Sequence, residues 1–75
     1  MVRVKVKLYA TLRRYRPDLG HGVAASLELR DGATLRDLLV ATGIPAAETK
    51  QCFVNAVGRE LDFVLHDGDE VGVFP

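Results

Sequence analysis

The stretch VRVKVKLY at residues 2–9 decides the fold, because its side chains alternate strictly between two sets. A period of two is that of a β-strand, whose successive side chains point to opposite faces of a sheet. We expect one set to face a core and the other to face solvent. The core set is Val2, Val4, Val6 and Leu8, and the solvent set is Arg3, Lys5, Lys7 and Tyr9.

A helix is predicted directly downstream of a turn at Asp31-Gly32. Thr34 is a favourable N-cap, and Asp37 complements the positive end of the helix. Gly43 is suited to end the helix, and Pro45 prevents its continuation. The apolar spacing places one buried face on the segment between these ends, formed by Leu35, Leu38, Leu39 and Thr42.

The remaining segments are assigned from alternation and from Gly and Pro positions. Before the helix we expect a helical turn, a loop and a second strand, at residues 10–15, 16–22 and 23–29. After it we expect a connector, a third strand, a brief edge segment, a helical turn, a turn and a final strand, at residues 46–50, 51–55, 56–61, 62–65, 66–69 and 70–74.

This order of elements favours one α+β domain over residues 1–75. A chain of 75 residues has room for a single core. The economical arrangement is a mixed sheet of four to five strands packed on one main helix, with the terminal strands parallel neighbours joined by a right-handed crossover. That is the β-grasp, or ubiquitin-like, architecture.

The composition excludes several classes of protein. An apolar fraction of 48% is too high for disorder, and a single cysteine excludes an intrachain disulfide and a cysteine-ligated zinc site. No apolar run approaches the ~20 residues of a membrane helix. The start, Met1–Lys5, alternates charge with valine, unlike a signal peptide. We therefore expect a cytoplasmic protein without membrane contact.

No constellation of residues predicts catalysis. His21 and His66 fall in predicted turns without a matching ligand set. Cys52 lies in an apolar strand, where burial makes a thiol inert and raises its pKa. We expect a protein that is not an enzyme, with no catalytic residues, no metal and no bound cofactor, acting through its surface or its end.

The charge is unevenly spread although it sums to zero. Residues 1–30 hold seven basic and two acidic residues, whereas residues 31–75 hold three basic and eight acidic ones. The basic stripe on the first strand, interspersed with tyrosine, is the pattern of a single-strand nucleic-acid site. The acidic residues of the other strands make the sheet nearly neutral overall, which disfavours nucleic-acid binding. A nucleic-acid-binding β-grasp domain is therefore kept only as a less favoured alternative.

The last third of the chain carries the most specific resemblance. LHDGDEVGVFP at residues 65–75, preceded by Val54-Asn55 and Leu61-Asp62, resembles the end of the MoaD/ThiS-type ubiquitin-like sulfur carriers. VKVKLYATLR at residues 4–13 is similar to the opening strand and first turn of that family. Residues 34–39 and 43–45 agree more loosely. The whole is closest to the small subunit of molybdopterin synthase.

The resemblance implies a carrier. In that family an E1-like adenylating enzyme uses ATP to activate the C-terminal carboxylate, which becomes a thiocarboxylate. The sulfur then passes to an acceptor, such as the large subunit of molybdopterin synthase. The family's tail ends in Gly-Gly, so we expect that tail to follow Pro75. The alternative is a non-covalent ubiquitin-like interaction module without the tail.

Two aromatic residues are candidates for partner binding. Tyr9 and Phe74 share the parity of the solvent-facing residues on the terminal strands, so parallel pairing would bring them together where the tail leaves. Alternatively, one ring folds over the sheet edge and covers Leu12. Pro75, at the start of the tail, and Arg13, which is positioned to meet acidic partner residues, complete the set.

Overall fold

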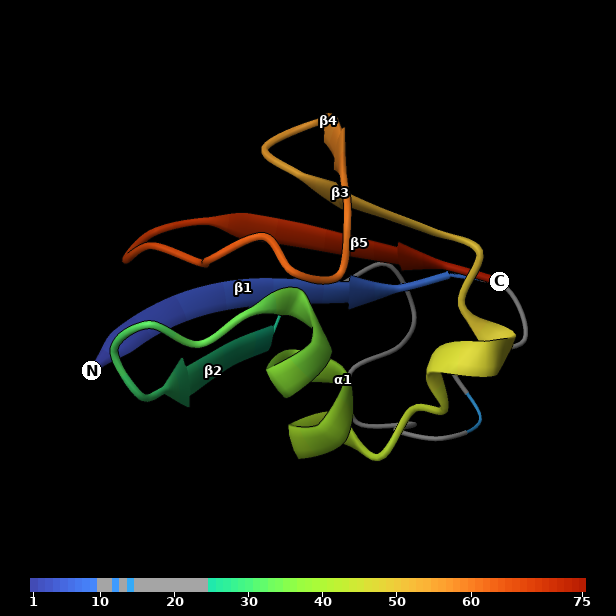
Figure 1. Cartoon of the computed structure of the whole chain (residues 1–75), viewed down its shortest axis with the longest axis horizontal. Helices are drawn as coiled ribbons and strands as arrows, with labels where there is room; N and C mark the ends of the chain where they lie inside the picture. The colour runs from blue at the N-terminus through green and yellow to red at the C-terminus, as the bar shows by residue number, and fades with distance from the viewer. Residues whose placement is uncertain (10–11, 13, 15–24) are drawn as a thin grey trace.

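The sheet of this protein has five strands and is crossed on one face by a single main helix (Figure 1). The computed structural model describes residues 1–9, 12, 14 and 25–75. In chain order the elements are β1 (Val2–Leu8), β2 (Ala25–Leu29), α1 (Leu35–Thr42), the 3-10 helix η3 (Ala46–Glu48), β3 (Gln51–Val54), β4 (Val57–Arg59) and β5 (Glu70–Phe74).

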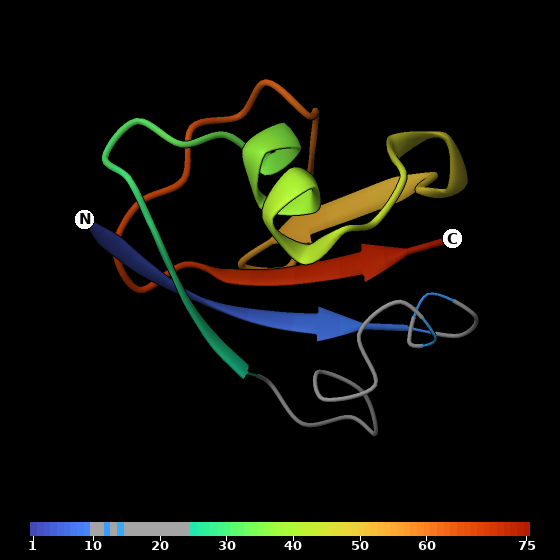
Figure 2. The ribbon, with the colours of Figure 1, turned by 90° about the horizontal axis from the view of Figure 1, so that it is seen from below.

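The strand order β2-β1-β5-β3-β4 confirms the β-grasp architecture. β1 pairs antiparallel with β2 and parallel with β5, so the two terminal strands form the middle of the sheet. Figure 2 shows α1 lying across one face of the sheet. The expected adjacency of the first and last strands is therefore confirmed.

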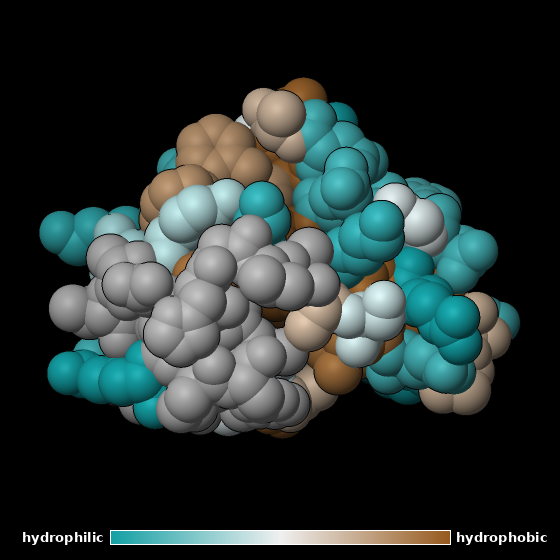
Figure 3. Space-filling view, turned by 180° about the vertical axis from the view of Figure 1, so that it is seen from behind, coloured by the Kyte–Doolittle hydropathy of each residue, from teal (hydrophilic) through white to brown (hydrophobic). Residues whose placement is uncertain are grey.

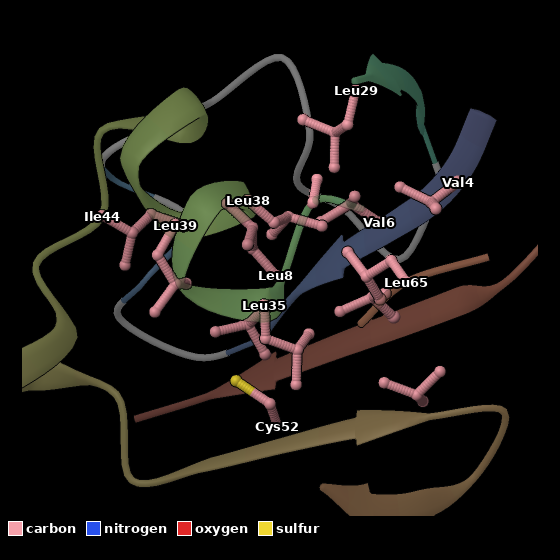
Figure 4. Close-up of a cluster of buried hydrophobic side chains, with 14 of the residues drawn as sticks. Val4, Val6, Leu8, Leu29, Leu35, Leu38, Leu39, Ile44, Cys52 and Leu65 are labelled. Atoms are coloured by element: carbon pink, nitrogen blue, oxygen red, sulfur yellow. The ribbon is translucent and has the colours of Figure 1, made fainter. Parts of the chain in front are cut away.

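The core lies between this sheet and α1 (Figure 4). The alternation of β1 is obeyed, because Val4 and Val6 have no exposed surface while Arg3 and Lys5 are exposed. The helix buries the face that the spacing predicts, and its buried residues are Leu35, Leu38, Leu39 and Thr42. The side chains of β5 that meet them are Val71 and Val73.

Both ends of α1 are capped as the sequence predicts. The hydroxyl of Thr34 accepts from the backbone N–H of Asp37, whose carboxylate accepts from the backbone N–H of Thr34 at 2.9 Å. At the other end Gly43 has a φ of 75°, and the N–H of Ile44 donates to the carbonyl of Leu39 at 3.0 Å. These bonds satisfy backbone groups that a short helix would leave without partners.

The helical turn predicted at residues 62–65 is wrong. Asp62 lies in a turn that the N–H of Phe63 closes by donating to the carbonyl of Glu60 at 3.0 Å, and Val64 forms an isolated antiparallel bridge with Thr34. The N–H of Leu35 donates to the carbonyl of Phe63, and the N–H of Leu65 donates to the carbonyl of Ala33 at 2.8 Å. The segment therefore pairs with the start of α1, where N–H groups need acceptors, instead of satisfying its own backbone.

The other expectations differ from the structure only at their boundaries. β1 ends at Leu8, although the N–H of Tyr9 still donates to the carbonyl of Val73 at 3.1 Å. The connector at 46–50 contains η3, and the edge segment at 56–61 contains β4. The predicted helical turn at 10–15 and loop at 16–22 fall mostly outside the described residues. Among the described residues, no helix is long and apolar enough to cross a membrane.

The capping carboxylate predicts an acid-sensitive contribution to stability. The backbone N–H of Thr34, with Arg30 nearby, lowers the pKa of Asp37 below its ordinary value of 3.8. A carboxyl whose folded-state pKa is lowered stabilises the fold above the unfolded-state pKa, and this contribution is lost as the pH falls through the lowered folded-state value.

Asp37→Asn is therefore expected to be less stable than the wild type at pH 7, with the difference shrinking from about pH 5 down to about pH 2. Urea unfolding of both proteins at stepped pH measures this difference. A difference that stays constant across the range would contradict a role for the charge.

Candidate functional site

Three aromatic rings gather on the face of the sheet opposite α1. Tyr9 and Phe74 are stacked, with ring centroids 4.2 Å apart and an interplanar angle of 5°. Phe53 meets Phe74 edge-on, with centroids 5.5 Å apart and an angle of 85°. All three side chains are half-buried. We call Tyr9, Phe53 and Phe74 the aromatic patch.

The register of the central strands brings the aromatic patch together. Gly72 of β5 is paired with Lys7 of β1 on one side and with Phe53 of β3 on the other. A Cβ atom on Gly72 would lie 3.3 Å from Cε2 of Tyr9 and 3.5 Å from Cε1 of Phe74. Because such contacts are crowded, the absence of a side chain at Gly72 lets the rings lie close to the sheet.

The patch borders a shallow hollow of about 440 Å³. Figure 3, seen from the side opposite α1, shows brown hydrophobic side chains next to teal charged ones on this side of the molecule. Charged residues of β1 and β5 form part of the wall of the hollow. The lining comprises Lys5, Lys7, Tyr9, Phe53, Ala56, Glu70, Val71, Gly72 and Phe74.

The aromatic patch lies where the described chain leaves the sheet. Phe74 is the last residue of β5, and its carbonyl accepts from the N–H of Lys50 at 3.1 Å. Pro75 follows and is exposed. Figures 1 and 2 show this end at the side of the molecule where η3 also lies. A partner bound to the patch would therefore reach any residues that follow Pro75.

The sequence predictions for the site have different outcomes. The meeting of Tyr9 and Phe74 is confirmed, whereas their role in partner binding stays a prediction. Arg13 lies outside the described residues. Phe53 is absent from the site residues predicted from the sequence. Residues 51–55 are correctly predicted as a strand, and the alternation of that strand places Phe53 opposite the buried Cys52 and Val54.

Other reactive side chains lie apart from the aromatic patch. Cys52 is buried in the core, and burial raises the pKa of its thiol, as predicted. The imidazole of His66 is 75% exposed, and its nearest carboxylate oxygen, Oδ2 of Asp69, is 4.0 Å from Nδ1. In the part of the chain that the structure describes, no three potential metal ligands come together.

One strained residue lies at the rim of the hollow. The two-residue turn between β3 and β4 has positive φ angles at both positions, 52° at Asn55 and 69° at Ala56. Asn55 is well suited to its place, because its side-chain amide donates to Asp69 and accepts from the N–H of Glu70, each at 3.0 Å. At Ala56 glycine would adopt the same backbone without strain.

The whole chain is similar to a family of ubiquitin-like domains. The family model described as Mut7-C ubiquitin matches residues 1–75. A Pyrococcus furiosus protein provisionally assigned as molybdopterin converting factor, subunit 1, is 30% identical and superposes with a TM-score of 0.79, covering 100% of this chain and 98% of that chain. These findings confirm the resemblance predicted from the sequence.

More distant structures share the fold. In one crystal structure of the small archaeal modifier protein 1 of Haloferax volcanii, the identity is 21% and the TM-score 0.77, covering 100% of this chain and 98% of that chain. In a second, the identity is also 21% and the TM-score 0.70, covering 97% and 93%. No curated protein sequence matches the chain significantly.

The strained turn predicts that substitution of alanine by glycine changes the free energy of unfolding in opposite directions at two positions. Ala56→Gly is expected to raise the free energy of unfolding by about 0.5–1 kcal/mol, because relief of the left-handed strain exceeds the added entropy of the unfolded chain. Ala41→Gly, at an exposed position of α1, is the matched control and should lower it by about 0.5–1 kcal/mol. Urea unfolding compares the two, and destabilisation by Ala56→Gly would contradict the strain.

Proposed function

We propose that this chain, which belongs to the Mut7-C ubiquitin family, is a sulfur carrier of the MoaD type that offers its C-terminal end to partners through the aromatic patch. The similarity over the whole chain to a molybdopterin converting factor subunit supports a role as a sulfur carrier or ubiquitin-like modifier. The stacked pair of Tyr9 and Phe74, beside the end of the described chain, is the observation that carries the proposal.

In this proposal the bonds are made and broken by partners. An E1-like adenylating enzyme joins the terminal carboxylate to AMP and releases pyrophosphate from ATP. Sulfide delivered by a donor then displaces AMP and leaves a thiocarboxylate. An acceptor enzyme, such as a molybdopterin synthase large subunit, takes the sulfur into its substrate, and water supplies the oxygen that regenerates the carboxylate. The chain binds no cofactor of its own, and its Gly-Gly tail would follow Pro75.

The aromatic patch supplies what such partners need. Half-buried rings present apolar area at a low entropic cost, and aromatic anchors dominate the energy of many interfaces. The stack and the hydrogen bond from Lys50 to Phe74 hold the last strand in place. A partner can therefore bind the rigid aromatic patch while the residues that follow Pro75 enter the active site of that partner.

A second candidate is favoured by the description of the family, which joins ubiquitin to Mut7-C. In this alternative the domain is a non-covalent ubiquitin-like module that binds or positions a Mut7-C domain, through the same aromatic patch. No terminal activation is then needed. The two candidates differ in the chemistry of the terminus and in the need for ATP.

The mass of the C-terminal peptide, measured on protein isolated from its own cells, separates them. The sulfur carrier predicts a terminus extended to Gly-Gly, with a fraction in which one oxygen is replaced by sulfur. It also predicts ATP–pyrophosphate exchange when the purified full chain is added to an E1-like adenylating enzyme of the same organism. A terminus without Gly-Gly would exclude thiocarboxylate chemistry and leave the non-covalent module.

The aromatic patch is tested with Tyr9→Ala and Phe74→Ala. Either change should weaken binding of that adenylating enzyme at least tenfold, because each removes a ring from the centre of the surface. Since stacked pairs contribute about 0.5–1.5 kcal/mol, the loss of stability should stay below the ~2–5 kcal/mol of Leu38→Ala in the core.

Val40→Ala is the matched control for this surface. Val40 is 76% exposed on α1, away from the patch, so its truncation should leave both binding and stability unchanged. Calorimetric titration and urea unfolding supply the two readouts. Equal binding by all three variants would overturn the role of the patch.

A further inference from the structure

Two lysines of β1 border the aromatic patch. Lys5 is exposed and Lys7 is half-buried, and neither makes an ion pair with any described residue. Other basic side chains do pair: Arg3 of β1 with Glu28, Arg36 of α1 with Asp62, and Arg30, which follows β2, with Asp37. A positive charge without an ionic partner among the described residues is available to a carboxylate from another protein.

The register places Lys7 beside the floor of the hollow. Lys7 is paired with Gly72, over which the rings of Tyr9 and Phe74 fold, and Lys5 is paired with Glu70. The four-carbon stem of a lysine adds apolar surface while its ammonium group reaches outward. The hollow therefore combines an apolar floor with a positive rim on the β1 side.

We propose that this hollow binds an acidic segment of a partner protein, which places an apolar side chain over Gly72 and a neighbouring carboxylate against Lys7 and Lys5. The proposal deepens the proposed function, because it names the chemistry of the partner that the aromatic patch recognises. It requires only contacts from residues of β1, β3 and β5 that line one hollow. In a segment that alternates acidic and apolar residues, the apolar side chains would contact the floor of the hollow and the acidic ones its positive rim.

Single-stranded nucleic acid fits the same hollow less well. Base stacking needs free ring faces, and Tyr9 and Phe74 already use one face each in their mutual stack at 4.2 Å. Glu70 also lines the hollow, where it would repel a phosphate backbone. A protein segment carries separate carboxylates and can place one near Lys7, which is paired with Gly72 and not with Glu70.

The test is an NMR titration of the isotope-labelled chain with a short peptide of alternating glutamate and leucine. We expect the amide signals of Lys7, Gly72 and Phe74 to shift together. A peptide in which lysine replaces glutamate, and an oligouridylate, should leave these signals in place. Raising the salt concentration should weaken the binding of the acidic peptide, because the lysine contacts are exposed to solvent.

Matched lysine variants separate this site from general attraction by charge. Lys7→Gln should lower the affinity for the acidic peptide at least threefold, whereas Lys50→Gln should leave that affinity unchanged. Lys50 is also exposed and makes no ion pair among residues 1–9, 12, 14 and 25–75, but it lies outside the hollow. The amide spectrum of each variant reports directly that its fold is intact.

Four outcomes would overturn the inference. They are no shifts with the acidic peptide, shifts confined to other parts of the chain, binding of oligouridylate at these signals, and an equal loss of affinity in the two lysine variants. Because the peptide titration requires neither ATP nor a modified terminus, its result is independent of the proposed carrier chemistry. A terminus without Gly-Gly together with a positive titration would refute the carrier alone. The reverse pair of results would refute the acidic-segment site alone.

Discussion

The parallel pairing of β1 with β5 is the constraint on which the rest of the structure depends. It joins the two ends of the sequence in the middle of the sheet and leaves the edges to β2 and β4. One face of the pair supplies valines to the core under α1, among them Val6 and Val73. Since side chains alternate, the other face must bring Tyr9 and Phe74 together. The core and the candidate site therefore lie on opposite faces of the same pair of strands, β1 and β5.

Local chemistry made most of this fold predictable. The alternation of β1 and the capped helix depend on residues close together in sequence, so the pattern alone indicates them. The prediction for residues 62–65 was wrong because the partners of this segment are distant in the sequence. Its backbone pairs with Ala33 and Leu35, about thirty residues earlier in the chain, and extended pairing replaced the helical turn that its sequence allows. Short segments whose hydrogen bonds go to distant partners cannot be assigned from local pattern.

The residues of the candidate site were also predictable only as far as their positions follow from local pattern. Tyr9 and Phe74 follow from parity once the terminal strands are taken as parallel neighbours. Phe53 requires the additional knowledge that β3 pairs with β5, and Gly72 requires the register that sets it beneath the rings. Ala56 gives no signal at all in the sequence, because its positive φ is imposed by the two-residue turn.

Two local features that oppose stability meet at one hollow. Gly72 weakens a central strand, and Ala56 holds a strained backbone. Lys7, which has no ion pair among the described residues, borders the same hollow. At the capped helix, by contrast, local chemistry agrees with the fold. Sequences that fold well keep such conflicts few and place them where function requires them. Their concentration beside the aromatic patch is therefore an argument, independent of any relative, that this face binds a partner.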